Sequence, residues 1–205
     1  MNSWVKSDSI YLSINYCDEE KDFALAKICG GILPIIKEND HKLLMNLCKG
    51  GTEEAKWRRM VHVQMDVTAP LYWWKEFETY KIGTVSNSCS TMHKIQAKEF
   101  TLDDFSCEHL LSDGLSLLNE IIYTLNLYRT FYNDHSFDDP KVPWWQMIQL
   151  LPTSYNQRRT IDLNYEVLAA QYRQRKDHKL DEWHQYTDWI RSLPYSEFIT
   201  MGEIK

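Results

Sequence analysis

Two segments of the chain alternate apolar and polar residues, which is the period-two pattern of a β-strand with one buried face. The first segment covers residues 9–16 and the second covers residues 60–67. Their apolar positions are Ile10, Leu12 and Ile14 in the first, and Val61, Val63, Met65 and Val67 in the second. We therefore expect two strands, each presenting one face to a core.

Helical patterns fill most of the remaining chain. Acidic residues at its start and Gly30-Gly31 at its end predict a helix that begins at Cys17 or Asp18. Pro70 suits the first turn of a later helix, because its missing N–H would have no partner there anyway. Residues 83–92 lack apolar periodicity and are predicted to form an ordered loop. The other predicted helices span residues 40–48, 71–80, 112–132, 144–151, 155–175 and 180–193.

These elements predict a single α+β domain that covers residues 1–205, with few strands and many helices. No repeat, linker or block of charge divides the chain. Aromatic residues make up 13% of the sequence, with eight Trp and twelve Tyr, which excludes a disordered chain. The Trp-rich segments suggest packing between helices or between subunits.

The formal net charge of −6 excludes a protein that coats duplex nucleic acid, because that function needs a basic surface. A small anionic ligand in a local basic pocket is compatible with this charge. The seven glycines form no phosphate-binding loop of the Walker or Rossmann pattern. Five cysteines without a C-x-x-C pair indicate neither a disulfide framework nor a zinc ribbon. We therefore expect a cytoplasmic protein, and no segment is predicted to span a membrane.

Cys89 is the cysteine that is placed most like a reactive group, because Ser88 and Ser90 flank it in the polar loop. A nucleophile needs a base, and His93 is the candidate. The alternative is a loop cysteine without chemistry. The histidines are scattered, and none pairs with a second ligand at the spacing of a zinc site, so no metal is predicted.

A basic segment stands out near the C-terminus of this acidic chain. Arg173 and Arg175 are two residues apart on the predicted helix, so they point to different sides of it. One interpretation is a solvated charged face. The other is a single inward-facing arginine that grips a phosphate with its planar fork. The basic residues are Arg158, Arg159, Arg173, Arg175, Lys176 and Lys179.

Four features then occur in a fixed order along the chain. A strand ends at Pro70, an aromatic helix follows, the polar loop 81–90 comes next, and Leu150-Leu151-Pro152 precedes Asn164 and an Arg-rich helix. Together they resemble the flavin-dependent thymidylate synthase family, over about Ile10 to Ile190. The resemblance implies a small antiparallel sheet flanked by several long helices. It also implies a homotetramer with its sites between subunits.

The resemblance implies a set of site residues. Arg175 falls on the arginine that grips the nucleotide phosphate in that family, and the loop residues fall on its Ser-x-Asn-Glu-x-Ser pattern. Asn164 falls on a flavin-contacting Asn, and Thr79-Tyr80-Lys81 stands where the family has Arg-His-Arg. The implied substrate-binding residues are Arg175, Ser90, Ser88 and Asn87. The implied cofactor-binding residues are Asn164, Lys81 and Tyr80, and no catalytic residue is assigned.

Departures from the family pattern concentrate at the implied site. Residues 54–60 lack both histidines of the corresponding family segment, and Lys81 alone keeps a positive charge in the triplet. Glu166 stands where the family has an arginine, and Lys179 where it has a histidine. Because a carboxylate repels a pyrophosphate where an arginine attracts it, these changes predict weakened FAD binding.

Two hypotheses follow. The family, as the resemblance implies, passes a methylene group from folate to deoxyuridylate and reduces it with a flavin hydride, which serves dTMP biosynthesis. The first hypothesis is a diverged enzyme of this kind that still binds a pyrimidine deoxynucleotide at a remodelled site, with or without FAD. The second is a flavin-free, catalytically inactive, homo-oligomeric binding or interaction protein that kept the fold.

Overall fold

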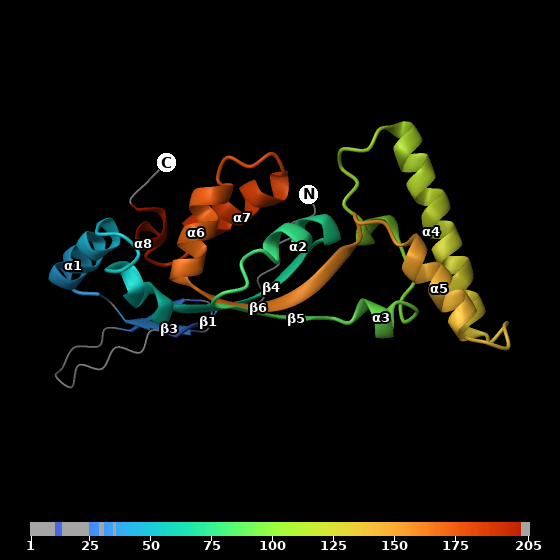
Figure 1. Cartoon of the computed structure of the whole chain (residues 1–205), viewed down its shortest axis with the longest axis horizontal. Helices are drawn as coiled ribbons and strands as arrows, with labels where there is room; N and C mark the ends of the chain where they lie inside the picture. The colour runs from blue at the N-terminus through green and yellow to red at the C-terminus, as the bar shows by residue number, and fades with distance from the viewer. Residues whose placement is uncertain (1–10, 14–24, 29–30, 35, 202–205) are drawn as a thin grey trace. The chain divides into compact units, whose positions relative to one another are not determined.

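The computed structural model describes residues 11–13, 25–28, 31–34 and 36–201 (Figure 1). The chain divides into two compact units. The first unit comprises residues 1–67, 78–87 and 159–205, and the second comprises residues 68–77 and 88–158. The division falls inside three strands, which are β4 (His62–Pro70), β5 (Thr84–Ser88) and β6 (Asn156–Asn164).

The main sheet has the strand order β1-β4-β6-β5, with β1 (Tyr11–Ser13) antiparallel to β4. Leu12 of β1 lies opposite Val63 of β4. The predicted alternation along β4 is confirmed, because its apolar positions are almost fully buried and its polar positions are not. The buried positions that alternate are Val61, Val63, Met65, Val67 and Ala69, and Pro70 at the end of β4 is buried as well. The α+β class with a small antiparallel sheet is likewise confirmed.

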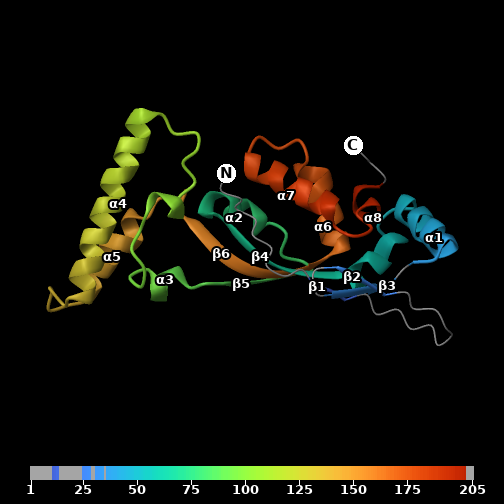
Figure 2. The same cartoon turned by 180° about the vertical axis from the view of Figure 1, so that it is seen from behind.

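Helices of the first unit gather around α6, which packs against η1, α7 and α8 (Figure 2). A second, two-stranded antiparallel sheet pairs β2 with β3. The core of this unit includes Leu168, Trp183, Tyr186 and Phe198, which are all at most 1% exposed. The elements are β2 (Leu25–Ile28), β3 (Gly31–Pro34), α1 (Glu38–Lys49), η1 (Ala55–Met60), α6 (Tyr165–Arg175), α7 (Asp181–Ser192) and α8 (Glu197–Thr200).

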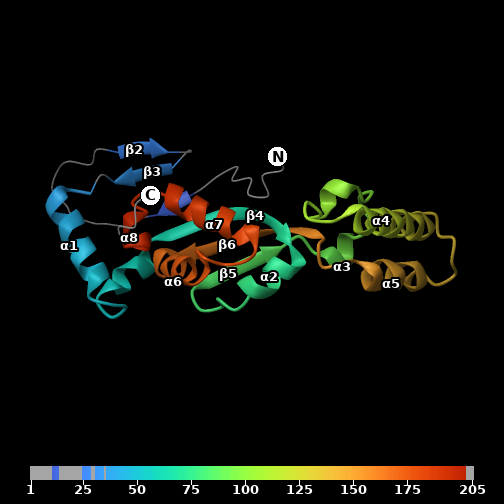
Figure 3. The same ribbon diagram turned by 90° about the horizontal axis from the view of Figure 1, so that it is seen from above.

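Two helices dominate the second unit, where α4 and α5 run alongside each other (Figure 3). Leu118, Ile122 and Leu125 recur at helical spacing along α4 and pack into one cluster with Met147 of α5. The helix predicted over residues 112–132 is therefore confirmed, and these three residues lie on its buried face. The elements are α2 (Leu71–Phe77), α3 (Thr91–Lys94), η2 (Leu102–Asp104), α4 (Ser112–Asn133) and α5 (Lys141–Leu150).

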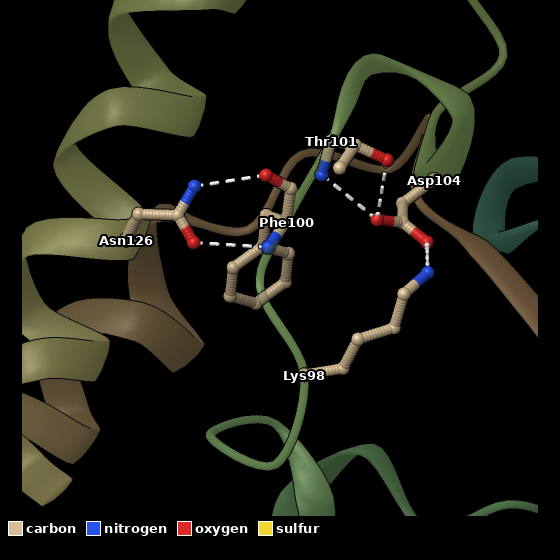
Figure 4. A network of polar contacts seen from close by, with 5 residues as sticks. All are labelled: Lys98, Phe100, Thr101, Asp104 and Asn126. Carbon is tan, nitrogen blue, oxygen red and sulfur yellow. Dashed lines mark hydrogen bonds and ion pairs between the residues drawn. The ribbon is translucent and has the colours of Figure 1, made fainter.

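A polar network anchors the segment before η2 to α4 (Figure 4). The amide of Asn126 accepts a hydrogen bond from Phe100 N at 2.9 Å and donates one to Phe100 O at 2.8 Å. Thr101 and Asp104 form a capping box at the start of η2, and Lys98 Nζ lies 2.9 Å from Asp104 Oδ1. One side chain of a core helix thus satisfies both backbone groups of a buried phenylalanine.

Three predictions of secondary structure were wrong. A helix was predicted to begin at Cys17 or Asp18, but residues 25–28 of that segment form a strand. The other residues of the predicted helix lie outside the described residues. Residues 156–164 form β6, because Ile161 and Leu163 are buried on one face and polar residues alternate with them. Residues 84–88 form β5 rather than a loop. Since β5 is an edge strand and largely exposed, its sequence carries no apolar alternation.

Candidate functional site

Arg175 and Tyr80, which were predicted to bind substrate and cofactor, lie in direct contact. Arg175 Nε donates a hydrogen bond to Tyr80 Oη at 2.9 Å, and Tyr80 Oη donates to Gln174 Oε1 at 2.8 Å. The guanidinium carbon of Arg175 lies 4.7 Å from the centroid of a ring of Trp183 and 5.6 Å from that of Tyr80. Cation–π attraction and a hydrogen bond therefore hold the half-buried guanidinium in one orientation.

Asn164, the predicted flavin contact, is the N-cap of α6. Its side-chain oxygen accepts a hydrogen bond from Val167 N at 3.1 Å, and the residue is 7% exposed. Gly83 lies close to the Asn164 side chain: a Cβ added to Gly83 would be 3.2 Å from Asn164 Nδ2. Gly83 has a φ of +78°, which a glycine adopts without strain. The fold thus brings the turn after Lys81 against the Asn164 amide.

The predicted loop residues lie on exposed backbone. Asn87 and Ser88 end β5 with exposed side chains, whereas Ser90 caps α3 by accepting a hydrogen bond from His93 N at 3.3 Å. Cys89 is a free, exposed thiol, and its backbone N–H donates to Arg158 O. Asn87 belongs to the first unit and Ser88 and Ser90 to the second. Asn87 therefore shares a unit with Arg175, whereas Ser88 and Ser90 belong to the other unit.

Glu166 forms a buried ion pair with Arg58, which the sequence did not suggest. Arg58 Nη2 lies 2.7 Å from Glu166 Oε2, and the side chains are 6% and 17% exposed. Arg58 Nε also donates to this carboxylate at 2.8 Å, and Arg58 Nη1 donates to Phe198 O at 3.0 Å. The carboxylate that departs from the family pattern thus carries its own counter-charge. Arg58 was missed because no element was predicted over residues 55–59, where the structure has η1 (Ala55–Met60).

The polar face of the first unit's sheet carries a second cluster. His62 Nδ1 lies 2.9 Å from Asp162 Oδ1, and Gln64 Nε2 donates to Asp162 Oδ2 at 2.8 Å. Partial burial acts to raise the pKa of Asp162, but the hydrogen bonds from His62 and Gln64 and the nearby imidazole outweigh it and lower this pKa. His62 is half-buried and pairs with this carboxylate.

Among residues 36–201 and the short strands before them, no group of three or more His, Cys, Asp and Glu side chains is arranged to hold a metal ion. In the same part of the chain, no helix combines the length and the apolar character that crossing a bilayer requires.

Two of the three predicted cofactor residues already have partners within the chain. Asn164 uses its oxygen as a helix cap beneath Gly83, and the Tyr80 hydroxyl is engaged by Gln174 and Arg175. Only Lys81 of the three presents an exposed side chain. In the single chain, the arrangement of these three residues does not fit a flavin.

The fold is similar to that of solved enzyme structures. No protein-family model matches the sequence, and no curated protein sequence matches it. Two similar solved structures are crystal structures of the flavin-dependent thymidylate synthase ThyX from Helicobacter pylori with FAD and dUMP. Each aligns with a TM-score of 0.60 and 11% sequence identity. Each alignment covers 82% of this chain, and it covers 84% of the first ThyX chain and 83% of the second. The chain therefore has a ThyX-like fold.

Proposed function

We propose that this protein is a diverged flavin-dependent thymidylate synthase-like protein that binds a pyrimidine deoxynucleotide, with Arg175 as the phosphate anchor. The observation that carries the proposal is the clamp on Arg175 formed by Tyr80 and Trp183. A guanidinium that is already oriented loses little conformational entropy when it binds a phosphate. The solved structures of similar fold support the ligand class, since they contain dUMP.

The loop residues supply the second part of the proposed site. Asn87, Ser88 and Ser90 offer amide and hydroxyl groups of the kind that hydrogen-bond a nucleotide. In this proposal they complete the site with Arg175 in a homo-oligomer, as the family resemblance implies. A monomeric protein in size-exclusion chromatography with light scattering would contradict this arrangement. The cytoplasmic location expected from the cysteines stays a prediction.

A flavin-free, catalytically inactive binding protein is the second candidate, and two observations favour it. Asn164 is buried as a helix cap. Glu166, which stands where the family has an arginine, is paired with Arg58. Both reduce what the chain can offer to FAD. Titration with FAD, followed by flavin absorbance of the washed protein, separates the candidates: retained flavin favours the enzyme, and a colourless protein that binds dUMP favours the binding protein.

The nucleotide proposal is tested with Arg175→Ala. We expect its dUMP affinity in isothermal titration calorimetry to fall by about tenfold or more, because a charge-assisted contact to the phosphate is lost. Arg191→Ala is a matched control, since Arg191 Nε donates to Tyr172 Oη at 3.1 Å and its guanidinium carbon lies 5.2 Å from that ring.

The two variants lose the same kind of Arg–Tyr contact in the same unit, so a general loss of stability would affect both. A wild-type protein that does not bind dUMP overturns the proposal. So does an Arg175→Ala variant that binds dUMP as tightly as the Arg191→Ala variant.

A further inference from the structure

One edge of the main sheet is formed by β5, which follows β6 at the end of the strand order (Figure 3). The strand holds no charged residue and no proline, the two kinds of residue with which edge strands commonly avoid pairing with another chain. Val85 of this strand is 70% exposed, and Ile82 just before it is 94% exposed. An edge of this kind is open to pairing with a further strand.

The backbone groups of β5 that point away from β6 follow from one hydrogen bond. Cys89, directly after β5, donates its N–H to Arg158 O on β6 at 3.2 Å. Consecutive residues of a strand turn their N–H and C=O groups to opposite sides, so those of Thr84, Ser86 and Ser88 point to the open edge. Within the part of the chain that the structure describes, no strand pairs with β5 at that edge.

The three outward positions are symmetric about Ser86. In an antiparallel pair of two β5 strands around a two-fold axis at Ser86, the two Ser86 residues exchange both hydrogen bonds, and Thr84 of each strand does so with Ser88 of the other. Every outward N–H and C=O group then has a partner. Residues 82–90 carry no charged side chain, so this pairing opposes no like charges in a chain with a net charge of −6.

We propose that β5 pairs with β5 of a second copy of this chain, antiparallel and in register about Ser86. Val85 of each copy then lies opposite the partner's Asn87, which covers part of the apolar surface that the single chain leaves in water. A second copy is the occupant because the outward backbone groups and the neutral side chains of β5 complement themselves.

The pairing also joins two parts of the nucleotide site, and this consequence rests on the proposed function. Within one chain, Thr84 and Ser88 begin and end β5 and are about 13 Å apart, at a rise of about 3.3 Å per residue. Across the pair, Cα of Ser88 lies about 5.5 Å from that of the partner's Thr84. The loop that begins at Ser88 is thus brought to the start of the strand that leads from the partner's Tyr80.

Disulfide trapping tests the register. Ser86→Cys/Cys89→Ser places a thiol at the two-fold axis and removes an exposed native thiol. Because a disulfide bridges Cα atoms about 5.5 Å apart, mild oxidation should give at least about tenfold more covalent dimer than in the control. The control, Ser192→Cys/Cys89→Ser, carries its thiol on an exposed residue of α7 in the same unit. No dimer on a non-reducing gel, or as much dimer in the control, would overturn the proposal.

A charge at the axis tests the assembly in the absence of a cross-link. Ser86→Lys places two lysines directly opposite each other, which should raise the dissociation constant of the assembly in analytical ultracentrifugation by about tenfold or more. Ser192→Lys adds the same charge away from the edge and should leave this constant unchanged. Equal constants for the two variants would contradict pairing through β5.

Nucleotide binding separates this inference from the proposed function. Arg175→Ala should lose dUMP affinity, yet in the Ser86→Cys/Cys89→Ser chain it should form the trapped dimer as before. Binding of dUMP by the wild type without trapping at residue 86 overturns the pairing and leaves the nucleotide proposal intact. Trapping in a chain that does not bind dUMP overturns the nucleotide proposal and leaves the pairing intact.

A mixture of two variants tests whether the site is shared between copies. Arg175→Ala and Ser88→Ala each damage one part of every site when present alone. In a mixed dimer, one of the two sites combines the intact Arg175 of one copy with the intact Ser88 of the other, so dUMP binding in calorimetry should return at that site. Native mass spectrometry verifies that mixed dimers form. Mixed dimers that bind dUMP no better than the separate variants would refute the shared site.

Discussion

The Arg58–Glu166 ion pair should be the most sensitive polar contact of the first unit. Its side chains are 6% and 17% exposed, and Arg58 makes two contacts to one carboxylate oxygen. Removing Glu166 alone leaves a buried guanidinium without its counter-charge, which costs about 3–5 kcal/mol in proteins. We therefore expect Glu166→Ala to lower the free energy of unfolding by an amount in that range.

A double-mutant cycle isolates the interaction from the loss of each side chain. Arg58→Met keeps much of the aliphatic stem but removes the guanidinium donor to Phe198 O, which then retains only the Cys48 thiol at 3.6 Å; this loss adds about 0.5–1.5 kcal/mol. Because the two buried groups interact directly, Arg58→Met/Glu166→Ala should be more stable than the sum of the two single changes predicts, by about 2–3 kcal/mol.

Urea denaturation measures the cycle, and hydrogen exchange of the α6 amides reports on the first unit alone. The Lys42–Glu38 pair is a suitable control, since its side chains are 66% and 82% exposed. Its coupling should stay below about 0.5 kcal/mol. A coupling for Arg58 and Glu166 that is no larger than this control would refute the reasoning.

Three other perturbations are expected to act at named contacts. Asn126→Ala should destabilise the second unit by about 2–3 kcal/mol in urea denaturation, because both backbone groups of buried Phe100 lose a partner. Asn119→Ala on the same helix is the control and should cost less than about 0.5 kcal/mol, since the Asn119 amide donates only to Leu115 O. Equal costs would contradict the prediction. Gly83→Ala should lower the free energy of unfolding more than Gly51→Ala in the same assay. Both glycines have a positive φ, but only at Gly83 would the new methyl group meet neighbours, Val167 at 3.1 Å and Asn164 at 3.2 Å. Asp162 has a lowered pKa, so its stabilising contribution is present above the unfolded-state pKa of about 3.9 and is lost as the pH falls through the folded-state value. Denaturation midpoints between about pH 5 and 2 should therefore fall less in Asp162→Asn than in the wild type, and parallel curves would show that the contacts of Asp162 do not favour its ionised form.

The predictions from the sequence succeeded where local pattern and burial agree. The alternation around Val63 and Met65 marked β4, and the helical spacing of Leu118, Ile122 and Leu125 marked α4. They failed for β6, because residues 155–175 contain both a strand and a helix and the apolar positions were fitted to a single helical period. The change of period occurs at Asn164, whose role as an N-cap shows only in the backbone around it.

The sequence by itself determined the α+β class, the main apolar faces and the resemblance that pointed to a ThyX-like fold. Only the tertiary structure decided which charges meet. Arg175 lies 95 residues from Tyr80, and Arg58 lies 108 residues from Glu166, so no local period could pair them. Helix geometry separates Arg173 from Arg175, but the packing of α1, η1 and α8 around α6 decides that Arg173 lines a cavity. Long-range packing, rather than residue type, therefore assigns each basic side chain to an ion pair, a clamp or a cavity wall.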